Sequence, residues 1–381
     1  MKVAAIICEY NPFHNGHQFH IEETRRKTGA GAVVAIMSGN FVQRGDVAVF
    51  PKILRSQAAI QGGADLVLEL PTPFATGSAE FFAQGAVRTL DSLGIIDYLS
   101  FGAECNNAAK LLELAELFTN EPPEFANLIK LYSKDGLSFP AARAKAAVEF
   151  VGADAGEILS SPNNILGIEY CKALLKLNSK IKPCVIERTG AGHDTEVTNG
   201  SIASASFIRK LLTDGYTDRA FSFMPEFAKE IFKNQPLHST KAIENAILCE
   251  LIKIPIEKLR EISDVTEGLE NRIKEAVLSA NSLDELIKSV KTKRYTHSRA
   301  RRVILSAFLG ITDNDRKASP QYIKILDHNE TGQKLIAAAK KTATLPIVRN
   351  TSQVNKLSDP EIKELWERER IFDKIYEMTK I

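Results

Sequence analysis

The sequence predicts an α/β protein with a parallel sheet, a helical insertion and a mostly α-helical C-terminal domain. Over the first hundred residues, short apolar runs alternate with segments of helical period, a pattern typical of parallel sheets that helices cover on both faces. After about residue 235, helical period persists while strand patterns fade. The chain has 381 residues, which exceeds the roughly 250–300 residues that one core spans, so two domains are expected.

The elements follow in order along the chain. Four apolar runs predict strands at residues 2–7, 32–38, 66–70 and 98–104. Helices are expected between them at 17–28, from Pro51 to Gly62 and at 79–93, since proline favours the first helical position. Several helices, a strand and a further helix are then predicted at 107–180, 182–188 and 203–214. We therefore divide the chain into a sheet domain, 1–235, with a helical insertion at about 107–180, and a helical domain, 236–381.

Composition narrows the class of protein. Lys plus Arg number 49 and Asp plus Glu 47. Residues 1–150 carry 13 basic and 16 acidic side chains and residues 151–381 carry 36 and 31, so a basic excess in the later part keeps a nucleic-acid partner open. Five scattered cysteines without a CxxC pair indicate a reducing compartment. No membrane-length apolar run and no signal peptide is visible, so we expect a cytoplasmic protein without membrane association or a stable protein partner.

The strongest motif is Asn11-Pro12-Phe13-His14-Asn15-Gly16-His17, which follows the first strand and opens the first helix. Ligands of open parallel sheets bind at the carboxyl ends of strands, and a helix N-terminus there offers free N–H groups to phosphate. His14 and His17 fall on one side of the first turn, where they can donate to phosphoryl oxygens and stabilise developing charge. Gly16 lets phosphate approach the backbone, and His20 either joins this site or lies on the surface.

The H-x-G-H pattern in this context resembles the nucleotidylyltransferase superfamily. That resemblance implies a Rossmann-like nucleotidylyltransferase sheet, attack of an acceptor on the α-phosphate of ATP, and release of pyrophosphate. Superfamily members carry a second motif at a late helix start, which Ser204-Ala205-Ser206-Phe207-Ile208-Arg209 fits loosely. Its two hydroxyls can cap the helix and reach phosphate. The alternative for both segments is a plain capped helix.

Other polar positions fall at the same predicted sheet edge. The loop from Ser38 to Asp46 follows the second strand, and its Arg44 can pair with a carboxylate or a phosphate. Gly102 is a position where an adenine or a ribose can lie against the backbone. Asn163 or Asn164 opens a helix as a cap or a ligand, and Arg188 ends a strand. Each position also has a purely structural interpretation.

A basic stretch, KTKRYTHSRARR, occupies residues 291–302 ahead of an apolar helix expected at 303–311. It predicts RNA binding, because clustered cations neutralise phosphates and release counterions. Tyr295 and His297 lie among the cations and can stack on bases. The alternative is a solvated charged face. The six cations are Lys291, Lys293, Arg294, Arg299, Arg301 and Arg302.

Seven strings occur in order along the chain: CEYNPFHNGH, MSGNFVQRGD, PKILRSQAAIQGGADLVLELP, FGAE, SPNNILGIEY, SASFIR and KRYTHSRARR. Together they resemble the tRNA(Met) cytidine acetate ligase family over essentially the full length. The resemblance implies a ligase that forms a carbon–nitrogen bond. It would activate acetate with ATP to acetyl-adenylate and acetylate N4 of the wobble cytidine of elongator tRNA(Met), giving N4-acetylcytidine. Mg²⁺ is expected with the ATP phosphates, and no tight protein metal site is expected.

The combined motifs and resemblance assign three groups of residues. The expected catalytic residues are His14, His17, Ser38 and Arg44. The expected ATP-binding residues are Ile7, Cys8, Glu9, Tyr10, Asn11, Pro12, Phe13, His14, Asn15, Gly16, His17, Gln18, Phe19, His20, Gly102, Asn163, Arg188, Ser204 and Ser206. The expected RNA-binding residues are the six cations of the basic stretch. Two other functions stay open: a small-molecule adenylyltransferase of the same superfamily, and a non-catalytic RNA-binding protein.

Overall fold

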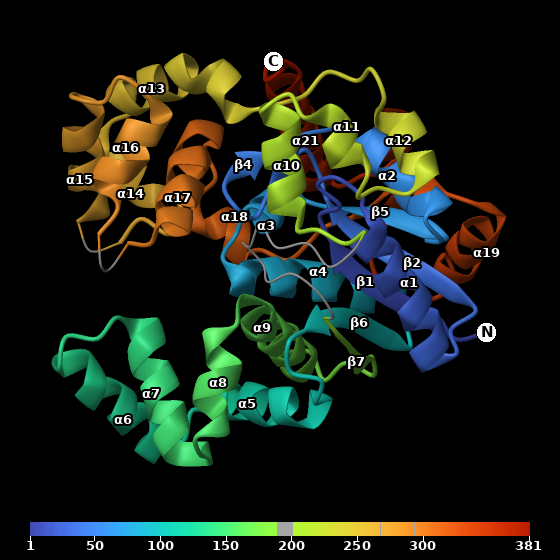
Figure 1. Cartoon of the computed structure of the whole chain (residues 1–381), viewed down its shortest axis with the longest axis horizontal. Helices are drawn as coiled ribbons and strands as arrows, with labels where there is room; N and C mark the ends of the chain where they lie inside the picture. Colours follow the sequence, from blue (N-terminus) through green and yellow to red (C-terminus); the bar gives the residue numbers. More distant parts are fainter. Residues whose placement is uncertain (189–200, 267, 293–294) are drawn as a thin grey trace.

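The computed structural model describes residues 1–188, 201–266, 268–292 and 295–381 (Figure 1). A seven-stranded sheet has the order β7-β6-β1-β2-β5-β8-β9. Its strands are β1 (Val3–Cys8), β2 (Ala32–Ser38), β5 (Leu66–Leu70), β6 (Tyr98–Ala103), β7 (Lys182–Glu187), β8 (Ile323–His328) and β9 (Ile347–Val348). Strands β7, β6, β1, β2 and β5 are parallel. The predicted α/β fold with a mostly parallel sheet is therefore confirmed, and each of the five predicted strands lies within one residue of its expected bounds.

Two helical layers cover the sheet, because successive side chains of a strand point to opposite faces. Ala5 and Ile36 belong to a core with α4 (Ala79–Leu93), α5 (Ala108–Asn120) and α9 (Pro162–Lys176). On the other face, Ile6 and Met37 belong to a core with α1 (Asn15–Thr28), α2 (Lys52–Gln61), α10 (Ala205–Thr213), α11 (Thr217–Phe221) and α12 (Glu226–Phe232). With both faces buried, most polar side chains of the sheet lie at or near the strand ends.

The predicted insertion is helical. Between β6 and β7 it contains α5, α6 (Pro123–Lys134), α7 (Phe139–Val151), α8 (Asp154–Ser160) and α9, and α5 to α8 form the lobe at the lower left of Figure 1. After residue 235, a second group of helices has its own apolar core. It contains η1 (Thr240–Ile243), α13 (Glu244–Lys253), α14 (Ile256–Glu261), α15 (Leu269–Val277), α16 (Leu283–Val290) and α17 (His297–Leu309).

The C-terminal part also contains two strands that the sequence analysis missed. Strand β8 pairs antiparallel with β5, and β9 extends the sheet from β8. Residues 323–348 therefore complete the sheet that the sequence analysis placed within residues 1–235. The apolar run IKIL is short and stands among helical segments, so its local pattern does not separate a strand from a helix. Its pairing with β5, more than 250 residues earlier, leaves no local trace.

The remaining elements close the structure around this sheet. They are the hairpin strands β3 (Phe41–Val42) and β4 (Asp46–Val47), and the helices α3 (Thr72–Ala75), α18 (Asp313–Lys317), α19 (Glu330–Ala339), α20 (Thr351–Asn355) and α21 (Pro360–Glu377). Helix α17 begins at His297 and not at residue 303, so part of the basic stretch is helical. None of the helices in the described ranges is both long enough and apolar enough to cross a membrane.

Candidate functional site

A cavity of about 280 Å³ lies at the carboxyl end of β1, where β1 meets β6 on one side and β2 on the other. The first motif, the start of α10, the β3–β4 hairpin and the ends of β6 and β7 all contribute to its wall. The predicted site residues in this wall are Ile7, Cys8, Glu9, Tyr10, Asn11, His14, Gly16, His17, Phe19, His20, Arg44, Gly102, Asn163, Arg188, Ser204 and Ser206. Segments that are separate in the sequence therefore form one site.

The H-x-G-H turn fixes both histidines against the backbone of α1. His14 is the N-cap, and its Nδ1 accepts a hydrogen bond from the N–H of Gly16 at 3.1 Å. Nδ1 of His17 accepts from the N–H of His14 at 3.3 Å, and the two rings stack with centroids 3.6 Å apart. A Cβ at residue 16 would lie 3.0 Å from Cε1 of His14, so glycine lets the imidazole ring lie close against this turn. The glycine makes room for an imidazole, in addition to the role expected from the sequence.

This geometry sets the protonation of the two rings. Burial, with smaller contributions from the charges of Arg188 and Arg209, lowers the pKa of His14 to about 3. Burial, His14, His20 and Arg188 also lower the pKa of His17. Both imidazoles are therefore neutral near pH 7, and because each Nδ1 is an acceptor, each Nε2 carries the proton. The site thus holds two neutral N–H donors in the cavity wall, which suit phosphoryl oxygens.

His20 belongs to this site and is not a surface residue. Its Nε2 lies 3.1 Å from Oγ of Ser100, and Ser100 Oγ lies 2.7 Å from Oγ1 of Thr24. Thr24 uses its own proton on the carbonyl of His20, so Ser100 donates to Thr24 and His20 donates to Ser100. Burial and Arg188 lower the pKa of His20 to about 4. Its Nδ1 is therefore an acceptor in the neutral ring.

The second motif lies opposite the histidines. Ser204 is the N-cap of α10 and accepts from the N–H of Phe207 at 3.2 Å. Arg209 donates to the carbonyl of Asn11 at 2.7 Å and to Oγ of Ser206 at 3.2 Å. This arginine lines the cavity and ties the second motif to the first, which explains why an arginine stands one turn after the two serines.

On the β6 side of the cavity, the neighbouring residues Asn163 and Asn164 have different surroundings. Asn163 lines the cavity and donates to Oε1 of Glu104 at 2.6 Å. Asn164 is buried, and its amide bonds the N–H of Cys105 and the carbonyl of Ile158. Its role is structural. Gly102 lies under Arg188, since a Cβ there would be 3.2 Å from Cγ of the arginine.

Five predicted site residues lie outside the cavity wall formed by the described residues. Ser38 is fully buried at the end of β2, and its Oγ contacts no hydrogen-bond partner in the described chain. Phe13 is also fully buried and packs on Tyr10 and His17. The other three have structural surroundings: Pro12 is buried, Asn15 donates to the carbonyl of Ser201, and Gln18 donates to Glu22. These residues shape the turn without reaching the cavity.

Several cavity residues were missed by the sequence analysis. They are mostly apolar side chains on strands and helices facing the sheet edge: Phe82, Phe101, Leu166, Tyr170, Ile186 and Ile202, together with Gln43. An apolar residue in a strand or helix looks the same whether it faces a core or a ligand, so no sequence signal marked them. Gln43 could have been found, because it directly precedes Arg44 in the polar loop.

The basic stretch is only partly available to a ligand. Lys291 is exposed, whereas Arg299 donates to the carbonyl of Asp264 and to Thr266, with its guanidinium 5.2 Å from the Tyr295 ring centre. Tyr295 is 7% exposed, so the expectation that it stacks on a base is wrong. Arg301 pairs with Asp46, and Arg302 is half-buried. Lys293 and Arg294 lie outside the described residues.

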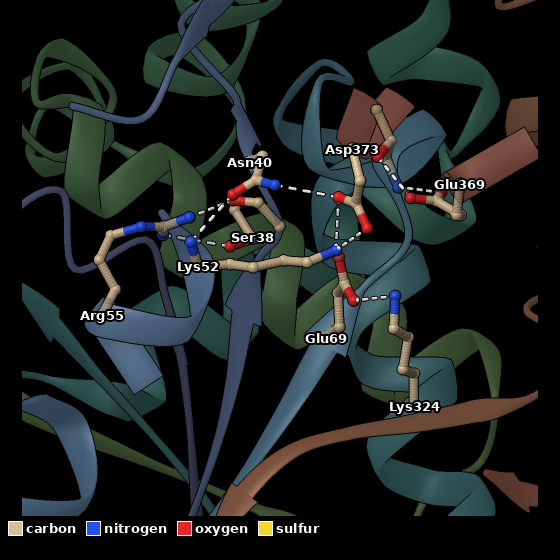
Figure 2. A network of polar contacts seen from close by, with 10 residues as sticks. Ser38, Asn40, Lys52, Arg55, Glu69, Lys324, Glu369 and Asp373 are labelled. Carbon is tan, nitrogen blue, oxygen red and sulfur yellow. Dashed lines mark hydrogen bonds and ion pairs between the residues drawn. The ribbon is translucent and has the colours of Figure 1, made fainter. Parts of the chain in front are cut away.

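A network of ion pairs joins α2, β5, β8 and α21 (Figure 2). Lys52 pairs with Glu69 and with Asp373, each at 2.6 Å, and Glu69 also pairs with Lys324 at 2.7 Å. Burial disfavours charge on Glu69, but Lys324 and Lys52 outweigh burial and lower its pKa to about 2. Asp373 also accepts from Asn40 at 2.9 Å. Helix α21 is thereby bonded to the loop that leads into the cavity.

Glu369 makes this region sensitive to pH. Burial and the neighbouring Glu69 raise its pKa to about 7, against the opposing effects of Lys324, Thr72 and Lys52. Its usual pKa is 4.5, so the stabilisation from protonated Glu369 is complete below pH 4.5 and is lost as the pH rises through 7. In Glu369→Gln the amide oxygen can accept from the N–H of Thr72 and the amide NH2 can donate to Oγ1 of Thr72, which reverses the direction of the second bond, and the side chain cannot ionise.

We expect Glu369→Gln to gain stability over the wild type between pH 5 and pH 8, on the order of 1–3 kcal/mol. Urea unfolding at a series of pH values measures this difference. Glu367→Gln, which alters an exposed ion pair on the same helix, is the control. Equal pH dependence of the Glu369→Gln variant and the wild type would show that Glu369 is already ionised at pH 5.

Residues 1–188, 201–266, 268–292 and 295–381 contain no group of three or more His, Cys, Asp or Glu side chains placed to hold a metal ion. The polar groups of the cavity wall are mainly N–H donors, which suit an anion.

The chain is similar to known proteins over nearly its whole length. A family model described as HIGH Nucleotidyl Transferase matches residues 1–380. A curated tRNA(Met) cytidine acetate ligase from Clostridium perfringens is 40% identical over 365 residues, covering 93% of this chain and 90% of the relative. A protein of the same name from Acetivibrio thermocellus is 40% identical over 394 residues, covering 99% of this chain and 95% of the relative.

Solved structures are similar over the whole chain. The crystal structure of apo Thermotoga maritima TmcAL superposes with a TM-score of 0.94 at 32% identity, covering 100% of this chain and 95% of the other. The structure of the same protein bound with alpha-thio ATP gives a TM-score of 0.93 at 31% identity, with the same coverage.

Proposed function

The chain belongs to the tRNA(Met) cytidine acetate ligase family, and we propose that it is an ATP-dependent ligase that acetylates N4 of the wobble cytidine of elongator tRNA(Met). The observation that carries the proposal is the pair of stacked, neutral histidines at the N-terminus of α1, in the wall of a cavity that also contains Arg44 and Arg209. The bound alpha-thio ATP in the similar TmcAL structure supports ATP as the ligand.

The first step joins acetate to ATP. A carboxylate oxygen of acetate attacks the α-phosphorus, the bond to the bridging oxygen breaks, and pyrophosphate leaves with its electron pair. Nε2–H of His14 and His17 would donate to the phosphoryl oxygens, where negative charge develops, and the guanidinium of Arg44 or Arg209 would add positive charge. The product is acetyl-adenylate, whose AMP leaving group makes the acetyl carbon reactive.

The second step transfers the acetyl group. N4 of cytidine attacks the acetyl carbon, AMP leaves, and the amine loses one proton, giving N4-acetylcytidine. The exocyclic amine is a weak nucleophile, so the reaction depends on holding it close to the acetyl carbon and away from water. A wobble base lies in a single-stranded loop and can enter a pocket without opening a duplex.

We propose that Mg²⁺ binds as a complex with ATP. Among the described residues, the wall of the cavity contains the carboxylates Glu9 and Glu187; Glu9 accepts from the N–H of Gln43, and Glu187 accepts from Asn106. The phosphates of ATP would therefore hold the ion, while this chain supplies hydrogen-bond donors.

A direct assay tests the proposed function. The protein is incubated with ATP and labelled acetate, with and without tRNA, and the nucleosides of the tRNA are then analysed by mass. We expect acetyl-adenylate without tRNA and N4-acetylcytidine when tRNA(Met) is added. Absence of both products would contradict the proposal, and adenylation of a small molecule in place of acetate would favour a different adenylyltransferase.

RNA binding by the basic stretch yields a separate prediction. Lys291→Ala combined with Arg299→Gln removes two cations while residue 299 keeps a polar side chain. We expect tRNA affinity to fall about 5–30-fold and the salt dependence of binding to decrease by about one or two ions. Lys258→Gln, at an exposed position on α14, is the matched control. Unchanged tRNA affinity over a range of salt concentrations would show that this stretch is a solvated face.

A further inference from the structure

The β3–β4 hairpin carries Gln43 and Arg44 into the cavity wall. The hairpin closes on itself through the N–H of Gly45, which donates to the carbonyl of Val42 at 3.0 Å. Its position relative to β1 is set by Glu9, whose Oε1 accepts from the N–H of Gln43 at 2.8 Å. A two-residue strand pair is too short to be rigid by itself, so its orientation must come from its neighbours.

Helix α21 holds the base of this hairpin. The amide of Asn40 donates to Asp373, and the Tyr376 hydroxyl donates to the carbonyl of Ala48, both at 2.9 Å. The Phe41 ring packs against Phe372 and Tyr376. Figure 2 shows Asn40 and Asp373 directed toward each other beside Lys52. These contacts fix where the hairpin starts and ends.

Helix α17 holds the tip. Oδ2 of Asp46 accepts from Arg301 at 2.5 Å, and Oδ1 accepts from Oγ1 of Thr240 at 2.9 Å. Gly45 has φ +71°, and a Cβ there would lie 2.5 Å from the backbone nitrogen of Arg302. The backbone of the hairpin tip therefore lies directly against α17, with Arg44 between Gly45 and the cavity residue Gln43.

The charges at this corner act on one another. Burial lowers the pKa of Arg209, and the charges of Glu9, Arg44, Asp46 and Arg301 act on it as well. The hairpin tip, α17 and the cavity arginine Arg209 therefore lie within electrostatic range. The exposed fractions of the Asp46 and Arg301 side chains are 35% and 22%, so solvent screens their ion pair only in part.

We propose that Asp46 and Arg301 form a positioning pair that holds the hairpin so that Arg44 is placed for acetate activation. This inference rests on the proposed function and adds a role for Arg301 that the RNA-binding assignment did not contain. The reason is geometric: displacement of a reacting group by about 1 Å can cost up to about 100-fold in rate. Asp46 does not itself line the cavity wall of the described residues, so it acts through Arg44.

The test uses acetate-dependent exchange of pyrophosphate into ATP by the full-length protein. We expect Asp46→Asn and Arg301→Met each to lower kcat by roughly 10–100-fold. KM for ATP should change less than about threefold, because the histidine turn of α1 is untouched. Arg301→Lys keeps the charge pair and should retain a rate within about threefold of the wild type. Glu377→Gln, in an exposed ion pair of α21, is the control.

A double variant makes the test specific. Because the ion pair is the contact that both variants remove, Asp46→Asn with Arg301→Met should lose clearly less rate than the product of the two single losses, although Asp46 also accepts from Thr240. Multiplicative losses, or a wild-type kcat in Asp46→Asn, would overturn the inference. If Asp46→Asn fails to fold, the comparison of Arg301→Lys with Arg301→Met decides: equal rates would overturn it.

Two measurements distinguish the positioning pair from a failure of the proposed function and from a role of the pair in RNA binding. A wild-type protein that forms no acetyl-adenylate contradicts the proposed function, whereas an active wild type with an equally active Asp46→Asn variant contradicts the positioning pair alone. We expect the tRNA dissociation constant of Asp46→Asn to stay within about threefold of the wild type. A loss of tRNA affinity as large as the loss of rate would place the pair in the RNA surface and overturn its positioning role.

Discussion

His14→Asn is expected to lower the rate of acetyl-adenylate formation by roughly 100–1,000-fold, the size of effect seen when one preorganised donor to developing charge is removed. Asparagine is a good N-cap and can accept from the N–H of Gly16 as Nδ1 of His14 does. It is too short to place a second donor where Nε2 lies. The substitution therefore separates the capping role from the phosphate role, and single-turnover formation of acetyl-adenylate measures the loss.

His14→Ala and Glu23→Gln complete this experiment. His14→Ala loses both roles, so its rate should match that of His14→Asn while its stability falls further, by about 1 kcal/mol. Glu23→Gln alters an exposed ion pair on the same helix and should keep the wild-type rate. If His14→Asn were as active as the wild type, His14 would be only a helix cap, and the proposed chemistry would lose its main support.

The parallel part of the fold could be predicted from the sequence because its information is local. The parallel strands β1, β2 and β5 are continuous or nearly continuous apolar runs, since both faces of the sheet are buried there, and segments of helical period separate one run from the next. Strand β8 has no such signal: it is one short run whose identity depends on pairing with β5. Pairing between strands that are far apart in the sequence cannot be predicted from local periodicity.

The candidate site shows the same division. His14, His17 and Arg44 were found because a polar group after a strand end has no core role to explain it, and all three line the cavity. Ser38 was assigned by the same rule, but it is the last residue of β2 and points into the buried interior. Whether such a polar residue lines the cavity or is buried therefore depends on whether the strand ends just before it or includes it. Arg301 was interpreted as RNA-binding because its partner, Asp46, is 255 residues away.

Lys52→Met is expected to reduce the free energy of unfolding by roughly 3–5 kcal/mol, the cost of removing one partner from a buried ion pair. The ammonium of Lys52 pairs with Glu69 and Asp373, and its pKa is raised because these carboxylates outweigh the effect of burial. Methionine fills similar space but leaves Asp373 without a cation and leaves the buried Glu69 with one cation, Lys324, in place of two. Urea unfolding followed by circular dichroism measures the change.

Lys374→Met, at an exposed position of α21, is the matched control and should change stability by less than about 0.5 kcal/mol. Adding Asp373→Asn to Lys52→Met removes the carboxylate that is left without a cation, whereas Glu69 keeps its ion pair with Lys324, so the double variant should be more stable than Lys52→Met alone. A double variant that is less stable by the full sum of both changes would mean that the two residues do not act as a pair. Because Asn40 and Lys52 share Asp373, loss of Lys52 also loosens the hairpin base, so catalytic rate should fall in the fraction that remains folded.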